Sequence, residues 1–103
     1  MDAVAEPIPG FDEFSSQMNS RFVAHDGDGP PIEFRLIEAN DLFSDTLSHS
    51  FSLMFQAPPT TAAEQRIYSL SNTELGTHDL FLVPVRQTDE GVVFEASFNI
   101  VKN

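Results

Sequence analysis

Apolar and polar residues alternate along several short stretches of the chain, which is the pattern expected of strands with one buried face. The clearest stretch is 32–38, where Ile32, Phe34 and Leu36 are separated by charged residues. Five further stretches have a strand-like pattern, at 21–25, 51–56, 66–70, 77–86 and 92–98. Six short strands joined by tight turns predict a mainly β fold, either a small six-stranded antiparallel barrel or a two-sheet sandwich.

Residues that favour turns separate most of these strands. The segment 26–31 contains only aspartate, glycine and proline, and predicts a hairpin between the first two strands. Pro58 and Pro59 are expected to end the third strand, because proline cannot donate a hydrogen bond to a strand ladder. Segments 71–76 and 88–91 predict two further turns.

Two segments have less regular patterns. Residues 39–50 are mostly polar, and we expect a loop that is held to the core by its three large apolar residues, Leu42, Phe43 and Leu47. Residues 77–86 are apolar on both faces for most of their length, which favours the most buried strand of the sheet. Pro84 indicates a sheet edge or a bulge within it.

Phe11, Phe14 and Met18 follow one another at helical spacing before the first strand. They predict a short amphipathic helix of about two turns. Asn19 is expected to close this helix, because asparagine tolerates the left-handed conformation. We expect the apolar face of the helix to plug one end of the barrel; the alternative is that it contacts another protein.

The length of 103 residues fits a single domain. Residues 1–10 end in Ile8-Pro9-Gly10 and are expected to form a flexible N-terminal arm. The single β-barrel-like domain is then expected to span residues 11–103.

Seven phenylalanines occupy positions where they are expected to fill the interior of the barrel, namely Phe22, Phe34, Phe51, Phe55, Phe81, Phe94 and Phe98. The alternative is that they line a cavity that binds an apolar small molecule. A filled core would exclude such a cavity.

The chain contains 16 acidic and 5 basic residues, which gives a formal net charge of -11 at pH 7. This charge repels phosphate backbones and anionic membrane surfaces, so neither nucleic acid nor a membrane is an expected partner. It is explained either by solubility or by a basic protein partner. The absence of cysteine and of a signal-peptide pattern favours a cytoplasmic bacterial protein.

Few residues carry a pattern of known chemistry. The segment His25-Asp26-Gly27-Asp28-Gly29 resembles the start of a calcium-binding loop, but Ile37 occupies the position where such a loop needs glutamate. We therefore interpret the segment as a hairpin turn; the alternative is a weak cation site at Asp26 and Asp28. His25, His49 and His78 are far apart in the sequence, and we expect them to be exposed residues near strand ends rather than metal ligands.

The sequence contains no Gly-x-Ser-x-Gly motif and no glycine-rich phosphate loop. Its arginines, Arg21, Arg35, Arg66 and Arg86, are isolated along the chain, so we expect no basic patch. We therefore predict no catalytic residue, no cofactor and no metal site, and a protein that is not an enzyme.

Five segments consist of ordinary strand and turn residues, but their order and spacing along the chain are together more specific than the residues of any one of them. They are Phe51-Ser52-Leu53-Met54-Phe55, Tyr68-Ser69-Leu70, Glu74-Leu75-Gly76, Leu80-Phe81-Leu82-Val83-Pro84-Val85 and Phe94-Glu95-Ala96-Ser97-Phe98-Asn99. Together they resemble an uncharacterised family of small bacterial domains. The resemblance implies a compact β-barrel-like fold with no established activity, and it suggests an association with phage-tail-like assemblies.

These patterns together favour a non-enzymatic module for protein interaction or assembly, which binds a protein partner or forms a homo-oligomer. The expected contact segments are residues 39–50, residues 1–10 and a strand edge near Pro84. The alternative function is that of a small barrel binding an apolar small molecule.

Overall fold

The computed structural model describes residues 8–25 and 29–101. Within these residues the chain forms one short helix and six strands: α1 (Phe11–Ser15), β1 (Arg21–Ala24), β2 (Ile32–Ser44), β3 (Ser48–Ala57), β4 (Arg66–Asn72), β5 (Gly76–Thr88) and β6 (Gly91–Val101). The predicted mainly β fold with one N-terminal helix is therefore confirmed.

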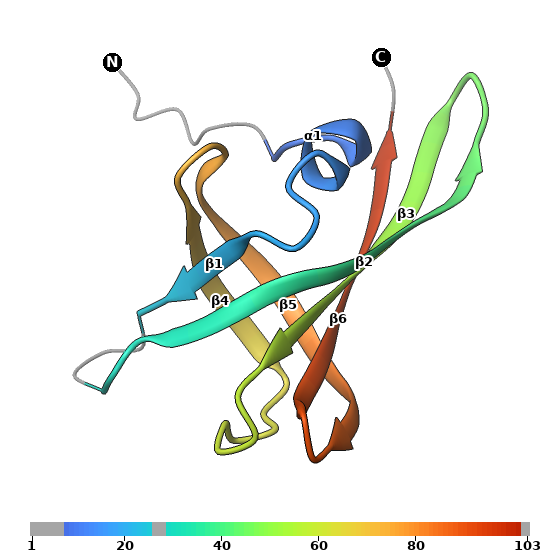
Figure 1. Cartoon of the computed structure of the whole chain (residues 1–103). Helices are drawn as coiled ribbons and strands as arrows, with labels where there is room; N and C mark the ends of the chain where they lie inside the picture. Colours follow the sequence, from blue (N-terminus) through green and yellow to red (C-terminus); the bar gives the residue numbers. More distant parts are fainter. Residues whose placement is uncertain (1–7, 26–28, 102–103) are drawn as a thin grey trace.

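The strands form a single antiparallel sheet that closes into a barrel in the order β1-β2-β3-β6-β5-β4, with β4 paired back to β1 (Figure 1). Successive hairpins connect β1, β2 and β3, and likewise β4, β5 and β6. The pairing of β3 with β6 and that of β1 with β4 join the two groups. The predicted hairpin between the first two strands is confirmed by the pairing of Ala24 with Ile32, although residues 26–28 lie outside the described residues.

At one end of the barrel, β5 and β6 separate and leave a gap between these two strands. The described part of β6 pairs with β5 only from Gly91 to Glu95, and from Ala96 onward it pairs with β3 alone. The first half of β5 pairs instead with β4. Figure 1 shows α1 at this end of the barrel, between the β4–β5 turn and the end of β6.

The helix closes this opening with phenylalanine side chains. Phe14 is almost fully buried, and its ring lies 5.5 Å from that of Phe98 and 6.4 Å from that of Phe51. The prediction that the helix plugs one end of the barrel is thus confirmed, although α1 is only five residues long. The helix ends at Ser15 with Ser16 as its C-cap, so the predictions that it includes Met18 and that Asn19 closes it are wrong. Asn19 has φ of 67°, the left-handed conformation expected of it.

Aromatic rings fill the interior of the barrel. The ring of Phe34 lies 5.6 Å from that of Tyr68 and 5.5 Å from that of Phe94, both nearly edge-on. Phe22 and Phe55 make a similar contact, with ring centroids 5.2 Å apart. Aromatic pairs prefer such tilted arrangements, and here each ring is packed by its neighbours. Aromatic side chains in mutual contact, together with buried leucines such as Leu36 and Leu53, therefore fill the core, as expected of so small a barrel. The prediction is wrong for Phe81, which is 52% exposed on the outer face.

The predicted loop at 39–50 is wrong. Its first residues belong to β2, which extends to Ser44, and its last residues belong to β3, which begins at Ser48. The segment is polar because both faces of this hairpin contact solvent, so the sequence does not alternate as it does over the barrel.

The prediction that 77–86 forms the most buried strand is also wrong. β5 alternates between buried residues, such as Leu80 and Leu82, and exposed ones, and Phe81 is 52% exposed. An apolar residue on the outer face is indistinguishable in sequence from one in the core, which is why the strand looked apolar on both faces. The bulge expected at Pro84 is confirmed, because the register of β5 against β6 shifts between Pro84 and Arg86.

Candidate functional site

The most prominent surface feature is a β-hairpin that projects from the barrel, here called the hairpin arm and defined as residues 39–50. Figure 1 shows it as the green extension of β2 and β3. β1 pairs with β2 only as far as Arg35, and the last backbone contacts on that side join Leu36 to Asn19 and Ser20. Among the described strands, the arm part of β2 therefore pairs only with β3.

A hydrogen-bonded turn fixes the tip of the hairpin arm. The carboxylate of Asp45 accepts hydrogen bonds from the backbone N–H groups of Leu47 and Ser48, each at 2.8 Å. The N–H of Asp45 in turn donates to the carbonyl of Ser48 at 2.9 Å. Aspartate commonly closes turns in this way, and here it gives the tip a defined shape.

The hairpin arm presents large apolar side chains to solvent. Leu42 is 62% exposed, Phe43 is 55% exposed and Leu47 is 70% exposed. The sequence predicted that these residues hold the segment to the core, and this is wrong because all three are more than half exposed. Exposed apolar side chains grouped on one projecting element are typical of a protein contact surface.

The carboxylates along the hairpin arm and next to it in the sequence are not balanced by lysine or arginine from the same stretch of the chain. Residues 36–65 contain no lysine or arginine, whereas Glu38, Asp41 and Asp45 lie on or beside the arm. An apolar surface that carries these carboxylates is complementary to an apolar surface flanked by basic groups.

His49 connects the hairpin arm to the helix. Its Nε2 lies 2.9 Å from Oδ1 of Asp41, across the two strands of the arm. Its ring lies 5.8 Å from that of Phe11 in α1 and 5.4 Å from that of Phe51. The base of the arm is therefore packed against the same aromatic cluster that closes the barrel.

The three histidines lie in different surroundings. His25 is exposed, as predicted, but His49 is half-buried and His78 is buried, so the prediction is wrong for those two. Nε2 of His78 lies 2.6 Å from the carbonyl oxygen of Leu75, which can only accept, so this nitrogen is the donor. Over 8–25 and 29–101, no three His, Asp or Glu side chains gather in a group that could hold a metal ion. Asp26 and Asp28, of the calcium-like segment, lie outside those ranges.

The sheet brings together arginines that are isolated in the sequence. Arg21 in β1 is directly opposite Arg35 in β2, and Arg35 is opposite Gln56 in β3. These residues lie on the outer face, since their neighbours Phe22 and Phe34 are buried in the core. The expectation that no arginines cluster is thus wrong for this pair, because strand register and not sequence distance decides which side chains are neighbours.

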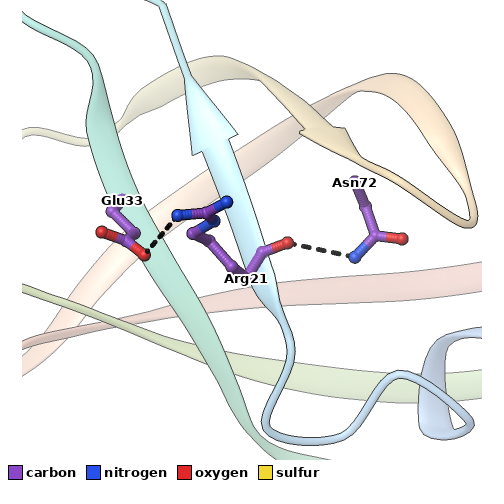
Figure 2. A network of polar contacts seen from close by, with 3 residues as sticks. All are labelled: Arg21, Glu33 and Asn72. Carbon is purple, nitrogen blue, oxygen red and sulfur yellow. Dashed lines mark hydrogen bonds and ion pairs between the residues drawn. The ribbon is translucent and has the colours of Figure 1, made fainter.

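The two arginines line a hollow of about 760 Å³ on the barrel surface. Gln56, Glu33, Glu90 and Asn19 supply further polar groups, and Ala57 and Pro58 are among the apolar residues of its wall. Nη1 of Arg21 lies 3.5 Å from Oε2 of Glu33 (Figure 2). Both side chains are more than 60% exposed, at 67% and 61%, so this ion pair holds Arg21 only weakly.

Asn72 is a structural polar residue beside this site. Its side chain is 6% exposed, and its amide nitrogen donates to the carbonyl oxygen of Arg21 at 3.1 Å (Figure 2) and to Ser20 Oγ at 3.2 Å. Its Oδ1 accepts from the N–H groups of Glu74 and Leu75, each at 2.9 Å. The residue thus connects the β4–β5 turn to the start of β1, which sequence reasoning missed because a turn asparagine gives no sign of a distant partner.

We expect replacement of Asn72 by alanine to lower the free energy of unfolding by about 1–3 kcal/mol, because three partly buried backbone groups lose their partners. Urea denaturation followed by circular dichroism measures the change. Ser71→Ala is the matched control, since Ser71 is a neighbour whose hydroxyl makes only an exposed contact with Thr77. A surface change of this kind is expected to cost less than about 0.5 kcal/mol. Equal effects of the two substitutions would contradict the role given to Asn72.

The geometry defines a small antiparallel barrel that is closed by a helix and carries one projecting hairpin. A family model described as Domain of unknown function (DUF6916) matches residues 9–98, and the chain belongs to this family. The family resemblance expected from the sequence is therefore confirmed. No curated protein and no solved structure gave a significant match. The helix within the described ranges is too short to cross a membrane.

Proposed function

We propose that this protein is a non-enzymatic interaction module that docks through its hairpin arm onto a basic protein partner within a larger assembly. The observation that carries the proposal is the group of Leu42, Phe43 and Leu47, exposed on an ordered hairpin whose charged residues are all acidic. A phage-tail-like structure, which the family resemblance suggested, is an assembly of this kind.

The energetics of the hairpin arm support this role. Burying a large apolar side chain contributes about 1.5–3 kcal/mol, and the barrel gains little of this from the three side chains at the arm. The same groups would contribute to association if a partner covered them. Their loss should therefore weaken binding much more than folding.

The acidic residues of the arm support a basic partner rather than a second copy. Two arms packed against each other would bring Glu38, Asp41 and Asp45 of both copies together, which like-charge repulsion disfavours. Carboxylates along an exposed strand edge also discourage unwanted strand pairing. A partner with lysine or arginine around an apolar groove is complementary to both the exposed apolar side chains and the carboxylates of the arm.

The aromatic core supports this role over that of an apolar-ligand carrier. Phe34, Tyr68 and Phe94 contact one another in the middle of the barrel, and each is almost fully buried. An apolar ligand in that space would have to displace these rings, which a close-packed core opposes.

Affinity capture from cells of the source organism tests the proposal, with the triple variant Leu42→Ser, Phe43→Ser, Leu47→Ser as the informative bait. We expect a partner held by the wild type to be reduced at least tenfold with this variant, because about 1.4 kcal/mol or more of binding free energy is removed. The melting temperature should change by only a few degrees, since the three side chains are exposed.

The matched control replaces two exposed apolar residues of the barrel wall, Ile67 and Phe81, which are paired across β4 and β5. The variant Ile67→Ser, Phe81→Ser should retain the partner. Equal capture by the triple variant and the wild type, or equal loss with the control, would exclude the hairpin arm as the docking element.

A further inference from the structure

The hollow beside β1 is a second feature of the surface, separate from the hairpin arm. Arg35 and Gln56 lie near the barrel end of the β2–β3 ladder, whereas the tip of the arm lies at its other end. From Arg35 to Ser44 the strand spans roughly 30 Å at about 3.3 Å per residue. A ligand in the hollow would therefore not contact the tip of the arm.

The arrangement of charges in the hollow is unusual for this chain. Only 5 of its 103 residues are basic, and two of these, Arg21 and Arg35, occupy directly opposite positions on adjacent strands. Like charges in such positions repel each other and destabilise the pair. The strand register continues the same row through Gln56 and Val93 to a third arginine, Arg86.

Carboxylates within the described residues neutralise this pair of arginines only in part. Glu33 forms an ion pair with Arg21 at 3.5 Å, and both side chains are exposed to solvent. Among the described residues, no carboxylate forms an ion pair with Arg35. The guanidinium group of Arg35 and the side-chain amide of Gln56 both offer hydrogen-bond donors to the hollow. An anion between the arginines would remove their repulsion and accept these hydrogen bonds.

We propose that this hollow binds a small multivalent oxyanion, through the guanidinium groups of Arg21 and Arg35 and the side-chain amide of Gln56. Arginine forms bidentate hydrogen bonds with planar carboxylates and with phosphates, and both groups offer the required chemistry. Glu33 and Glu90 at the same hollow can accept hydrogen bonds from hydroxyl groups of the ligand and repel additional negative charge. A compact ligand such as a phosphate monoester or a hydroxylated di- or tricarboxylate fits this set of groups.

Titrations followed by ¹H–¹⁵N NMR at constant ionic strength test the proposal, with inorganic phosphate in one series, citrate in a second and sodium chloride as the reference. We expect saturable shifts of the Nε–H signals of Arg21 and Arg35 and of the side-chain amide of Gln56 with at least one of the two oxyanions. Saturation by phosphate alone would assign a phosphorylated ligand, and saturation by citrate alone would assign a carboxylate.

Arg35→Gln should weaken the binding at least tenfold, and Arg21→Gln serves as a second variant if the first does not fold. Arg66→Gln is the control, because it removes the same charge from an arginine that lies over the ring of Tyr68, outside the hollow. It should bind as the wild type does. Shifts that grow linearly without saturation, or equal affinity of Arg35→Gln, Arg21→Gln and wild type, would overturn the proposal.

Discussion

Replacing Phe34 by alanine is expected to lower the free energy of unfolding by about 3–5 kcal/mol, a large part of the about 5–15 kcal/mol that stabilises a typical domain. Phe34 is 0% exposed and contacts the rings of Phe55, Tyr68 and Phe94. Truncation removes these contacts and leaves a cavity that rings on three other strands cannot fill without moving. Urea denaturation followed by circular dichroism measures the loss.

Phe81→Ala is the control for this prediction. It removes the same side chain from the outer face of the barrel, where Phe81 is half-exposed. We expect a loss of less than about 1 kcal/mol, because little apolar surface returns to water. If Phe34→Ala cost no more than Phe81→Ala, the aromatic core would not be the main source of stability.

Local sequence patterns predicted the barrel strands well. Apolar and charged residues alternate over 32–36 because one face of β2 is buried and the other is solvated. This alternation can be recognised directly in the sequence. The turn after Ala57 and the left-handed Asn19 were likewise predictable, because they depend on the conformational limits of single residues.

The hairpin arm could not be recognised in the same way. Over residues 41–47 neither face of the hairpin is buried, so apolar and polar residues do not alternate there, and the pairing of Asp41 with Phe51 is visible only in the fold. The apolar residues Leu42, Phe43 and Leu47 stand out from the polar residues around them, but burial in the core is the more common position of such residues.

The arginine pair shows a different limit of sequence reasoning. Arg21 and Arg35 are separated by fourteen positions and become neighbours only through the register of β1 against β2. That register is set by the alternation of buried residues, in which Phe22 faces Phe34. The sequence pattern predicts the strands but not their register, so residues that cross-strand pairing brings together are isolated in the sequence.

Replacing Gly91 by alanine is expected to lower the free energy of unfolding by about 3 kcal/mol or more, from backbone strain and steric overlap together. Gly91 begins β6 with φ of 148°, a conformation that residues with a Cβ atom rarely adopt. A Cβ atom there would also overlap the backbone carbonyl oxygen of Ala57, to which β6 is paired through Val92. The overlap involves backbone on both sides, so a side-chain rotation cannot relieve it.

Gly10→Ala is the matched control for this substitution. The only atom near a Cβ at Gly10 is Oε1 of Glu13 at 3.8 Å, an ordinary van der Waals distance, and Gly10 has φ of -83°. At the start of a helix the change should therefore cost at most about 1 kcal/mol. Thermal unfolding of both variants provides the comparison, with a markedly lower melting temperature expected for Gly91→Ala. Similar melting temperatures would contradict both the backbone strain at Gly91 and its close approach to Ala57, because these two features distinguish Gly91 from Gly10.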